Sequence, residues 1–417
     1  MLTRYVLFCF TPLFIAVTSL AQEQAPPTKI EPSETDAASD VISGPNGDAG
    51  ASLEEEEPLT QEQKEAIQAF VRSREEWANT LVELKTISIK FSNEEDRSPE
   101  AKEKYREVRE RGREQMNRTF DLAVKLFKSR PRDFESGSMM ATILDYREST
   151  SQYENSNEAA ELLLANGLTY PFLYKIAARS AFLDGKFDDV LKHYEAFVSV
   201  NGVDKLDNVD NVFANSVKTY PPLWAKELEI RGDEAKADDL PRVLLETTRG
   251  PVTIELFENE APIAVANFIT LVEDGYYDGA DFYQVVDDFL AMGGDPVGDG
   301  TGTSGKFISD ENTAENARQF FRGSIAMAKM PDPRKKGDYV PNSASSQFAI
   351  ALVPLIREDI PQTVFGRVID GMDVVCTFRR IDPQEKKEKA IVLPPDRILN
   401  AKIIRKRDHA YEVPYVK

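Results

Sequence analysis

The chain has 417 residues, and at roughly 100 to 200 residues per domain that length allows two or three folded units. A hydrophobic content of 41 % is sufficient for packed cores, whereas the formal charge of −20 argues against non-specific binding to nucleic acid or to an anionic membrane surface. The two histidines, His193 and His409, fall in different predicted domains, so a multi-histidine metal site or a histidine-based catalytic triad is excluded.

The first 21 residues have the three parts of a secretory signal peptide. Arg4 precedes an apolar run over residues 6–17, and small residues end at Ala21, where we expect cleavage. The alternative is a signal anchor that stays in the membrane, which the short run disfavours because a span needs about 20 apolar residues. We therefore expect an exported protein, periplasmic or extracellular, with no membrane span after signal removal. Cleavage removes Cys9 and leaves Cys376, which we expect to be buried and without a disulfide partner in the chain.

Residues 22–58 are predicted to form a disordered acidic linker. They are rich in Pro, Ser, Gly and Ala, lack aromatic residues and contain ten acidic residues against the single Lys29. Such a segment cannot bury enough apolar surface to offset the entropy that ordering removes.

Residues 59–240 are predicted to form a helical domain. Thr60 and Gln63 fit a capping box, after which apolar residues follow at helical spacing. The stretch 173–200 resembles one tetratricopeptide repeat with its turn at Gly185, although an ordinary helical hairpin explains the same pattern. No second copy follows at a period of about 34 residues, so both interpretations stay open. Further helices are expected over residues 100–128, 134–150, 156–166 and 222–238.

After Pro241 the pattern changes from helices to short strands. Segments 243–247 and 252–257 read as a hairpin. A helix is expected to begin at Pro262, a residue favoured in the first turn, and to end at Gly275. Further strands are expected around residues 281–286, 289–293, 324–329, 347–352, 363–369 and 398–404, with a second helix near 371–380. Many strands with two helices predict a closed antiparallel barrel.

Five glycines between residues 293 and 302 predict a tight loop that exposes its backbone, because glycine permits positive φ and close approach. A purely structural loop is the alternative. A phosphate cradle is disfavoured because no GK[ST] element is present.

Four sequence blocks then identify a family. The blocks VTIELFENEAPIAVANFITLVEDGYYDG, FLAMGGDPVGDGTGT, NSASSQFAIAL and TVFGRVIDGMDVV occur in this order between residues 241 and 408. The segment resembles a cyclophilin, followed by a C-terminal tail over residues 409–417. The resemblance implies an eight-stranded antiparallel barrel capped by two helices. The longer arrangement, with an exported helical segment ahead of the barrel, resembles multidomain cyclophilins of bacteria such as planctomycetes.

The resemblance implies peptidyl-prolyl cis-trans isomerase activity on exported polypeptides. The reaction rotates the bond before proline, whose resonance sets a barrier of about 18 to 20 kcal/mol. No metal, nucleophile or cofactor is implied. An apolar pocket holds the proline ring, fixed hydrogen bonds hold the chain, and a donor approaches the prolyl nitrogen as resonance is lost.

The donor position carries the main departure from the family. In the family an arginine in an F-H-R-[IV]-[IV] strand donates, but this strand reads Phe282-Tyr283-Gln284-Val285-Val286. Gln284 can still donate from its amide, although it is shorter and lacks the charge and fork geometry of a guanidinium.

The rest of the groove is also altered. Phe289 matches a pocket aromatic residue, and Leu290 is a volume-conserving replacement for the usual methionine. Met292 stands at the position of a glutamine that binds substrate backbone, and Ala349 replaces a second pocket phenylalanine. One polar contact and one apolar wall are therefore missing.

The remaining positions give a mixed result. Ala328 and Gln347 agree with the pattern, while Lys329 occupies an asparagine position whose backbone could still pair with a peptide. In the loop PLIREDIPQT a charged group replaces an apolar wall. That loop places Arg357 at a tryptophan or histidine position, Glu358 at a leucine and Gln362 at a histidine.

Three hypotheses follow. The first is an exported isomerase with weak activity at Gln284, acting on proline-containing polypeptides. The second is a cyclophilin-fold module, a pseudoenzyme candidate, that binds proline-containing segments without turnover. The third is a scaffold in which the helical domain holds a protein partner and the barrel acts as a stable spacer.

Overall fold

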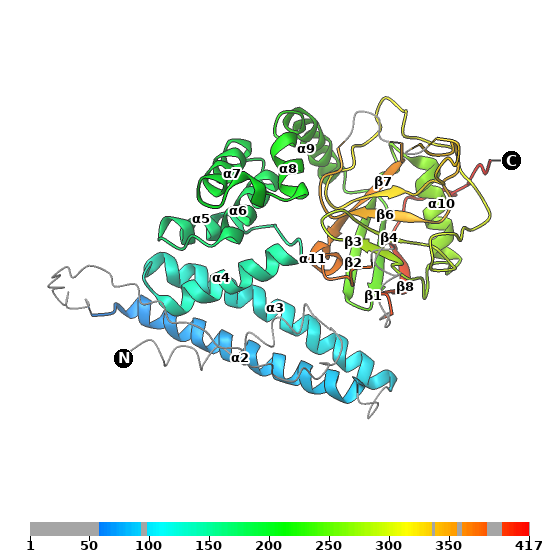
Figure 1. Cartoon of the computed structure of the whole chain (residues 1–417). Helices are drawn as coiled ribbons and strands as arrows, with labels where there is room; N and C mark the ends of the chain where they lie inside the picture. The colour runs from blue at the N-terminus through cyan, green and yellow to red at the C-terminus, as the bar shows by residue number, and fades with distance from the viewer. Residues whose placement is uncertain (1–57, 93–97, 336–337, 357–360, 382–393, 417) are drawn as a thin grey trace, which may run out of the picture.

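The computed structural model describes residues 58–92, 98–335, 338–356, 361–381 and 394–416. The expected signal peptide, the expected acidic linker up to residue 57, and both Arg357 and Glu358 lie outside the described residues. Among the described residues, no helix is both long and apolar enough to cross a membrane. The chain forms an N-terminal helical part and a C-terminal part built on a curled sheet, and the two lie side by side (Figure 1).

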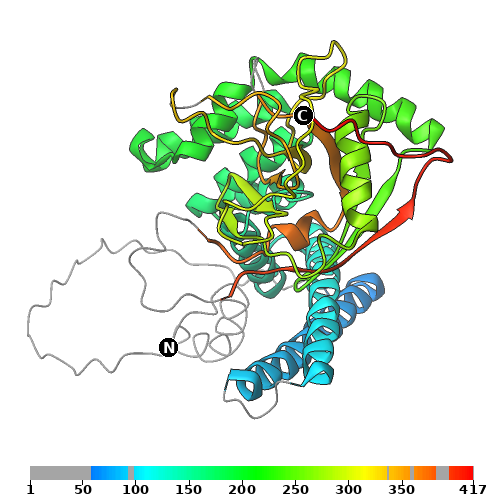
Figure 2. The same cartoon turned by 90° about the vertical axis from the view of Figure 1, so that its right-hand side faces the viewer.

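Two long helices, α2 (Gln61–Ser92) and α3 (Pro99–Ser129), pack along each other and project from the remaining helices (Figures 1 and 2). The expected capping box is present at the start of α2. The Thr60 amide donates to Gln63 Oε1 (3.0 Å), and the Gln63 amide donates to Thr60 Oγ1 (3.2 Å). A buried hydrogen bond of 2.8 Å joins the hydroxyls of Ser73 and Thr119 across the pair.

The other helices of this part follow in a compact stack. They are α4 (Phe134–Ser149), α5 (Asn157–Ala165), α6 (Pro171–Leu183), α7 (Phe187–Asn201), the 3-10 turn η1 (Val203–Lys205), α8 (Asn208–Ser216) and α9 (Tyr220–Ala237). Helices α6 and α7 form a hairpin around Gly185 at φ 74°, and its assignment as a tetratricopeptide repeat stays a prediction. Helix α8 is not among the helices expected from the sequence. It begins with a capping box in which the Asp210 amide donates to Asp207 Oδ1 (2.8 Å) and the Asp207 amide donates to Asp210 Oδ2 (3.0 Å). Two carboxylates there replace the usual Ser/Thr and Glu/Gln pair.

The C-terminal part contains one eight-stranded antiparallel sheet. Its strands are β1 (Arg242–Thr247), β2 (Gly250–Leu256), β3 (Gln284–Val286), β4 (Leu290–Gly293), β5 (Ser324–Met327), β6 (Phe348–Ala351), β7 (Val364–Asp370) and β8 (Ile398–Arg405). Their order is β3-β4-β6-β5-β7-β2-β1-β8. A closed barrel is not confirmed, because no ladder joins β3 to β8. The segments beside these two described strands are connected by an isolated bridge between Asp281 and Arg397, by an ion pair between the same two side chains (2.8 Å), and by a hydrogen bond from the Gly279 amide to the Ile398 carbonyl (2.8 Å).

Helix α10 (Pro262–Glu273) covers the sheet as expected, with Pro262 in its first turn and Gly275 at φ 68° after its end. The second helix is shorter than expected, because α11 spans only Met372–Val375 instead of residues 371–380. The Arg379 amide donates to Asp396 Oδ2 (2.7 Å), which turns the chain away from the helical path. Cys376 follows α11 and is fully buried, as expected.

The helical and sheet parts share an apolar interface. Phe321 of the sheet part is 1 % exposed, and its ring centroid lies 5.3 Å from that of Tyr220 and 5.1 Å from that of Trp224 on α9. The chain crosses between the parts after Ala237, where Asp238 adopts a left-handed conformation at φ 42°. The helical part is therefore packed against the sheet.

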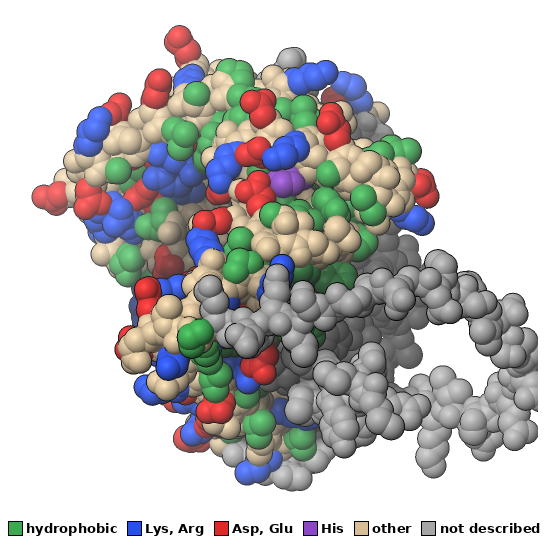
Figure 3. Space-filling view, turned by 90° about the vertical axis from the view of Figure 1, so that its left-hand side faces the viewer, with side chains coloured by type: hydrophobic (Ala, Val, Ile, Leu, Met, Phe, Trp, Pro, Cys, Tyr) green, Lys and Arg blue, Asp and Glu red, His purple; other side chains and the backbone are tan. Residues whose placement is uncertain are grey.

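The face of the molecule that carries the helical part has a mixed surface. Figure 3 shows acidic and basic side chains interspersed over its described residues, with small apolar patches between them.

Candidate functional site

The strand register brings three expected site residues into one row. Gln284 of β3 pairs with Met292 of β4, Met292 pairs with Ala349 of β6, and Ala349 pairs with Ala326 of β5. Directly paired residues project from the same face of a sheet. Ala291, the neighbour of Met292, is buried in the sheet interior, so the row lies on the outer face.

Gln284 stands at the accessible end of this row. Its side chain is half-buried, and its amide forms no hydrogen bond to any residue in the described part of the chain. The amide N–H groups are therefore available to a ligand placed over β3 and β4. A neutral amide there can donate one hydrogen bond to a developing lone pair.

Two apolar side chains flank Gln284. Leu290 is half-buried and pairs with Val286 of β3 and Ala351 of β6, while Phe289 is 44 % exposed. The Phe289 carbonyl accepts from the Leu352 amide (2.9 Å), which fixes the backbone at the start of β4. Phe289 and Leu290 together offer an apolar contact surface for a ring.

The opposite wall of the groove is largely filled. Ala326 is fully buried and Ala349 is 7 % exposed, and both belong to an apolar cluster that includes Phe320. Leu355 packs against this cluster and donates its amide hydrogen to the Phe320 carbonyl (2.9 Å). The sequence did not indicate this role of Leu355, because no local pattern places a loop residue on a distant sheet face.

Tyr283 is a site residue that the sequence analysis did not single out. Its hydroxyl donates to Gln347 Oε1 (2.7 Å), and the Gln347 amide donates to the carbonyls of Gly300 (3.1 Å) and Gly302 (2.7 Å). Burial, together with the nearby charge of Asp295, raises the pKa of Tyr283, so its phenol remains a donor. Both the oxygen and the nitrogen of the Gln347 side-chain amide are therefore hydrogen-bonded within the protein.

The glycine loop is organised by a buried carboxylate. Asp295 is 1 % exposed and accepts from the backbone amides of Val297 (2.8 Å), Asp299 (3.0 Å) and Gly300 (2.5 Å). A Cβ on Gly302 would lie 2.1 Å from Asp295 Oδ1. These backbone amides are already bound to Asp295, which favours the purely structural interpretation of the loop. The carbonyls of Gly300 and Gly302 fix the side chain of Gln347.

Lys329 does not present its charge to the groove. Its side chain is 6 % exposed and donates from Nζ to Asp310 Oδ2 (2.6 Å), a partner that the sequence did not indicate. The preceding residue, Ala328, donates its amide hydrogen to the Gln347 carbonyl (2.9 Å). The position therefore offers a peptide only backbone groups.

One expected groove residue lies elsewhere. Phe282 is 1 % exposed and its ring centroid lies 4.2 Å from that of Phe378, so it belongs to the sheet interior behind the groove. Its inclusion in the substrate-binding set was wrong, because the residue precedes β3 with its side chain turned inward. Gln362 is half-buried just before β7. Arg357 and Glu358 remain outside the described residues.

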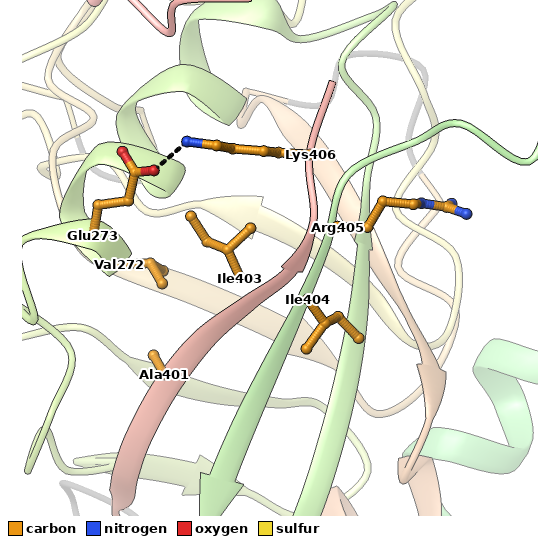
Figure 4. Close-up of a pocket in the computed structure, with 7 residues that line it drawn as sticks. All are labelled: Val272, Glu273, Ala401, Ile403, Ile404, Arg405 and Lys406. Atoms are coloured by element: carbon orange, nitrogen blue, oxygen red, sulfur yellow. Dashed lines mark hydrogen bonds and ion pairs between the residues drawn. The ribbon is translucent and has the colours of Figure 1, made fainter. Parts of the chain in front are cut away.

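Two clefts lie away from this row. One, of about 430 Å³, lies between α10 and β8, and Figure 4 shows Lys406 reaching across it to Glu273 (2.5 Å) above the apolar side chain of Ile403. The other, of about 570 Å³, is lined by α9 and by residues 315–319 with Phe321. Neither contains a residue of the Gln284 row.

The described ranges hold no group of three or more His, Cys, Asp or Glu side chains arranged to bind a metal ion.

Comparisons with known proteins match the sheet part. The family described as cyclophilin type peptidyl-prolyl cis-trans isomerase/CLD matches residues 242–403. A peptidyl-prolyl cis-trans isomerase-like 1 of Neurospora crassa is 35 % identical over 169 residues, which are 40 % of this chain and 96 % of that protein. A peptidyl-prolyl cis-trans isomerase of Helicobacter pylori is 35 % identical over 158 residues, 37 % of this chain and 91 % of that protein.

A solved structure of a Cryptosporidium parvum cyclophilin type peptidyl-prolyl cis-trans isomerase is 30 % identical, with a TM-score of 0.34 over 40 % of this chain and 99 % of that one. The helical part, Gln61 to Ala237, lies outside the residues that the family matches.

Proposed function

Since the chain belongs to the cyclophilin-type peptidyl-prolyl isomerase family through residues 242–403, we propose that it binds proline-containing segments on the outer face of β3 and β4 and isomerises them slowly, with Gln284 as the donor. The single observation that supports this site is the row from Gln284 through Met292 to Ala349, which flanks the apolar pair Phe289 and Leu290.

The low rate follows from the donor. Isomerisation needs a hydrogen bond to the prolyl nitrogen that strengthens only as amide resonance is lost. A charged, two-pronged guanidinium supplies more of that stabilisation than one neutral amide. Replacing it should raise the barrier by about 2 to 4 kcal/mol, or lower the rate about 30- to 1000-fold.

The buried Ala326 and Ala349 side of the groove predicts weak binding of proline-containing peptides. Ala349 and Ala326 are buried in one apolar cluster with Phe320, so a proline ring gains contact mainly from Phe289, Leu290 and Met292. Each apolar group that a ring leaves uncontacted lowers the hydrophobic gain, at about 25 cal/mol per Å². We therefore expect low affinity for short peptides.

A second candidate is a non-catalytic module that holds proline-containing segments of exported proteins. The enclosed side chain of Lys329 favours this second candidate. That position then offers only backbone groups, which suit peptide binding more than catalysis of isomerisation. We also propose that the protein is exported in the manner of bacterial, planctomycete-like multidomain cyclophilins, and that its helical part contributes a scaffold surface for a partner.

The test is a protease-coupled isomerase assay on a proline tetrapeptide with the full-length protein and its Gln284→Arg variant. We expect slow turnover in the unmodified protein and an increase of about 30- to 1000-fold in the variant. Gln68→Arg, an exposed glutamine on α2, is the matched control for the added charge and should change nothing. Turnover in the unmodified protein as fast as in its arginine variant would overturn the assignment of Gln284.

A further inference from the structure

The turn between β3 and β4 is held from outside the sheet. Asp288 is the residue before Phe289, and its Oδ1 accepts from the hydroxyl of Ser151 (2.6 Å) and from the hydroxyl of Tyr153. Both donors come from the connection between α4 and α5 in the helical part. The hairpin that carries Gln284 and Leu290 is therefore attached to a segment about a third of the chain away.

The contact is strained on both sides. Asp288 has a φ of 47° and Ser151 a φ of 59°, left-handed conformations in which neither residue is glycine. Such residues persist where their surroundings hold them. The backbone on each side is therefore shaped to bring the Ser151 and Tyr153 hydroxyls onto the Asp288 carboxylate.

The donors are fixed in position. Tyr153 is completely buried, and its hydroxyl accepts from Arg179 Nη1 (3.1 Å) while it donates to Asp288. Burial raises the pKa of Tyr153, so the phenol keeps its proton and remains a donor. Arg179 is itself 1 % exposed, binds Asp210 at 2.7 Å and lies 3.8 Å from Asp288 Oδ2.

A second set of contacts ties the same helical segment to the start of β4. Arg322 of the sheet part binds Glu154 at 2.6 and 3.0 Å, donates to the Ser151 carbonyl (2.7 Å) and donates to the Leu352 carbonyl. The Leu352 amide in turn donates to the Phe289 carbonyl (2.9 Å). Phe289 is therefore held through its own carbonyl on one side and through Asp288 on the other.

We propose that Asp288 is a positioning residue through which the helical part sets the β3–β4 hairpin, and with it the placement of Gln284, Phe289 and Leu290 for a proline-containing ligand. This inference rests on the proposed function for its consequence in binding. The interdomain contact with Ser151 and Tyr153 makes the helical part a component of the groove.

The chain supplies variants that separate the contact from general stability. Tyr153→Phe removes one donor and keeps the ring, whose edge-to-face contact with Phe213 has a centroid separation of 6.1 Å. Asp288→Gly removes the carboxylate but permits the left-handed backbone, and Asp288→Asn keeps an acceptor oxygen there. Asp287→Asn is the matched control, because the neighbouring Asp287 is 61 % exposed and pairs with Arg380 of the sheet part instead (2.7 Å).

The experiment uses the full-length protein with two readouts. Hydrogen exchange followed by mass spectrometry over residues 284–292 reports the hairpin, and calorimetry with a proline tetrapeptide reports the groove. We expect Tyr153→Phe and Asp288→Gly each to speed exchange in the hairpin and to weaken peptide binding about 3- to 30-fold. The double variant should resemble Asp288→Gly, because the carboxylate that accepts from Tyr153 is already absent there. Asp288→Asn and Asp287→Asn should stay near the unmodified protein.

Unchanged exchange and unchanged affinity in both Tyr153→Phe and Asp288→Gly would overturn the proposal, as would effects that add fully in the double variant. Should Tyr153→Phe fail to fold, Ser151→Ala tests the same contact from the second donor. If the unmodified protein and all variants fail to bind the peptide, the proposed function is wrong, and the exchange rates of the hairpin still decide whether Asp288 positions it.

Discussion

The guanidinium of Arg318 forms a two-pronged ion pair with the carboxylate of Glu227, at 2.9 Å from Nε to Oε2 and 2.8 Å from Nη2 to Oε1. Arg318 belongs to the sheet part and Glu227 to α9, and their side chains are 1 % and 3 % exposed. Glu234, about two turns further along α9, accepts from Arg318 Nη1 at 2.5 Å. The two parts are therefore joined by buried charge as well as by the apolar contacts of Phe321.

Arg318→Ala should destabilise the protein strongly, because it leaves the carboxylates of Glu227 and Glu234 buried without their main cation. Breaking one side of a buried pair costs about 3 to 5 kcal/mol. The measurement is the urea midpoint of the full-length protein, followed by tryptophan fluorescence, since Trp224 lies at this interface. Arg334→Ala is the control, because Arg334 is 82 % exposed in its pair with Asp332. Equal midpoints for the two variants would contradict the prediction.

Gly294→Ala should cost more stability than Gly279→Ala. Both glycines have a positive φ, 81° and 80°, so both substitutions carry the backbone strain of about 1 to 3 kcal/mol. A Cβ on Gly294 would additionally lie 2.3 Å from the Ser346 carbonyl oxygen, whereas a Cβ on Gly279 meets nothing within 4 Å. We expect an extra loss of about 1 to 3 kcal/mol for Gly294→Ala, measured by urea unfolding. A smaller loss at Gly294 than at Gly279 would mean that the Ser346 backbone yields.

The C-terminal tail should loosen as the pH rises. His409 contacts Glu258 through Nε2 and the Ala410 carbonyl through Nδ1 (3.0 Å), and Tyr411 donates to Glu258 Oε2 (3.0 Å). The Ala410 carbonyl and then Glu258 raise the pKa of His409 above its ordinary value of 6.5, against the smaller opposing effects of burial and of Arg407. The red C-terminal segment in Figure 2 runs beside the sheet part.

A folded-state pKa above the unfolded value stabilises the docked tail fully below about pH 6.5, and this contribution is lost as the pH rises through the raised pKa. Hydrogen exchange over residues 406–416 should therefore accelerate, beyond the ordinary base-catalysed increase, as the pH rises above 6.5 and through the raised pKa. His409→Gln serves as the control and should remove the additional dependence. An identical pH profile in the two proteins would show that Glu258 holds the tail through Tyr411 alone.

Ala349→Phe should fail to restore a proline pocket. The position has a phenylalanine in related cyclophilins, but here Ala349 is 7 % exposed among Ala326, Ala351 and Phe320. Overpacking this cluster should cost about 1 to 3 kcal/mol in unfolding free energy without tighter binding of a proline tetrapeptide. Val82→Phe, at a position 64 % exposed on α2, is the control for adding an aromatic ring. Unchanged stability with tighter peptide binding would show that the wall can open.

Much of the site could be predicted because it depends on short-range patterns. The alternation of side chains in a strand places Gln284 on one face and Val285 on the other, and the register then aligns Gln284 with Met292. The capping box of Thr60 and Gln63 and the burial of Cys376 likewise follow from spacing and residue type. The length of the second helix could not be predicted, because the Arg379 amide is taken by Asp396 from beyond the segment.

The amino-acid sequence by itself determined the helical and strand halves of this protein, the cyclophilin-like blocks, and the presence of a neutral amide at the donor position. The tertiary structure alone decided how open the groove is and which distant contacts fix the β3–β4 hairpin beside it. Leu355 packs against the apolar cluster that contains Ala349, and Tyr153 reaches Asp288 from 135 residues away. Periodicity and propensity act over a few residues, whereas contacts of this kind depend on how whole elements pack, so no local pattern in the sequence carries them.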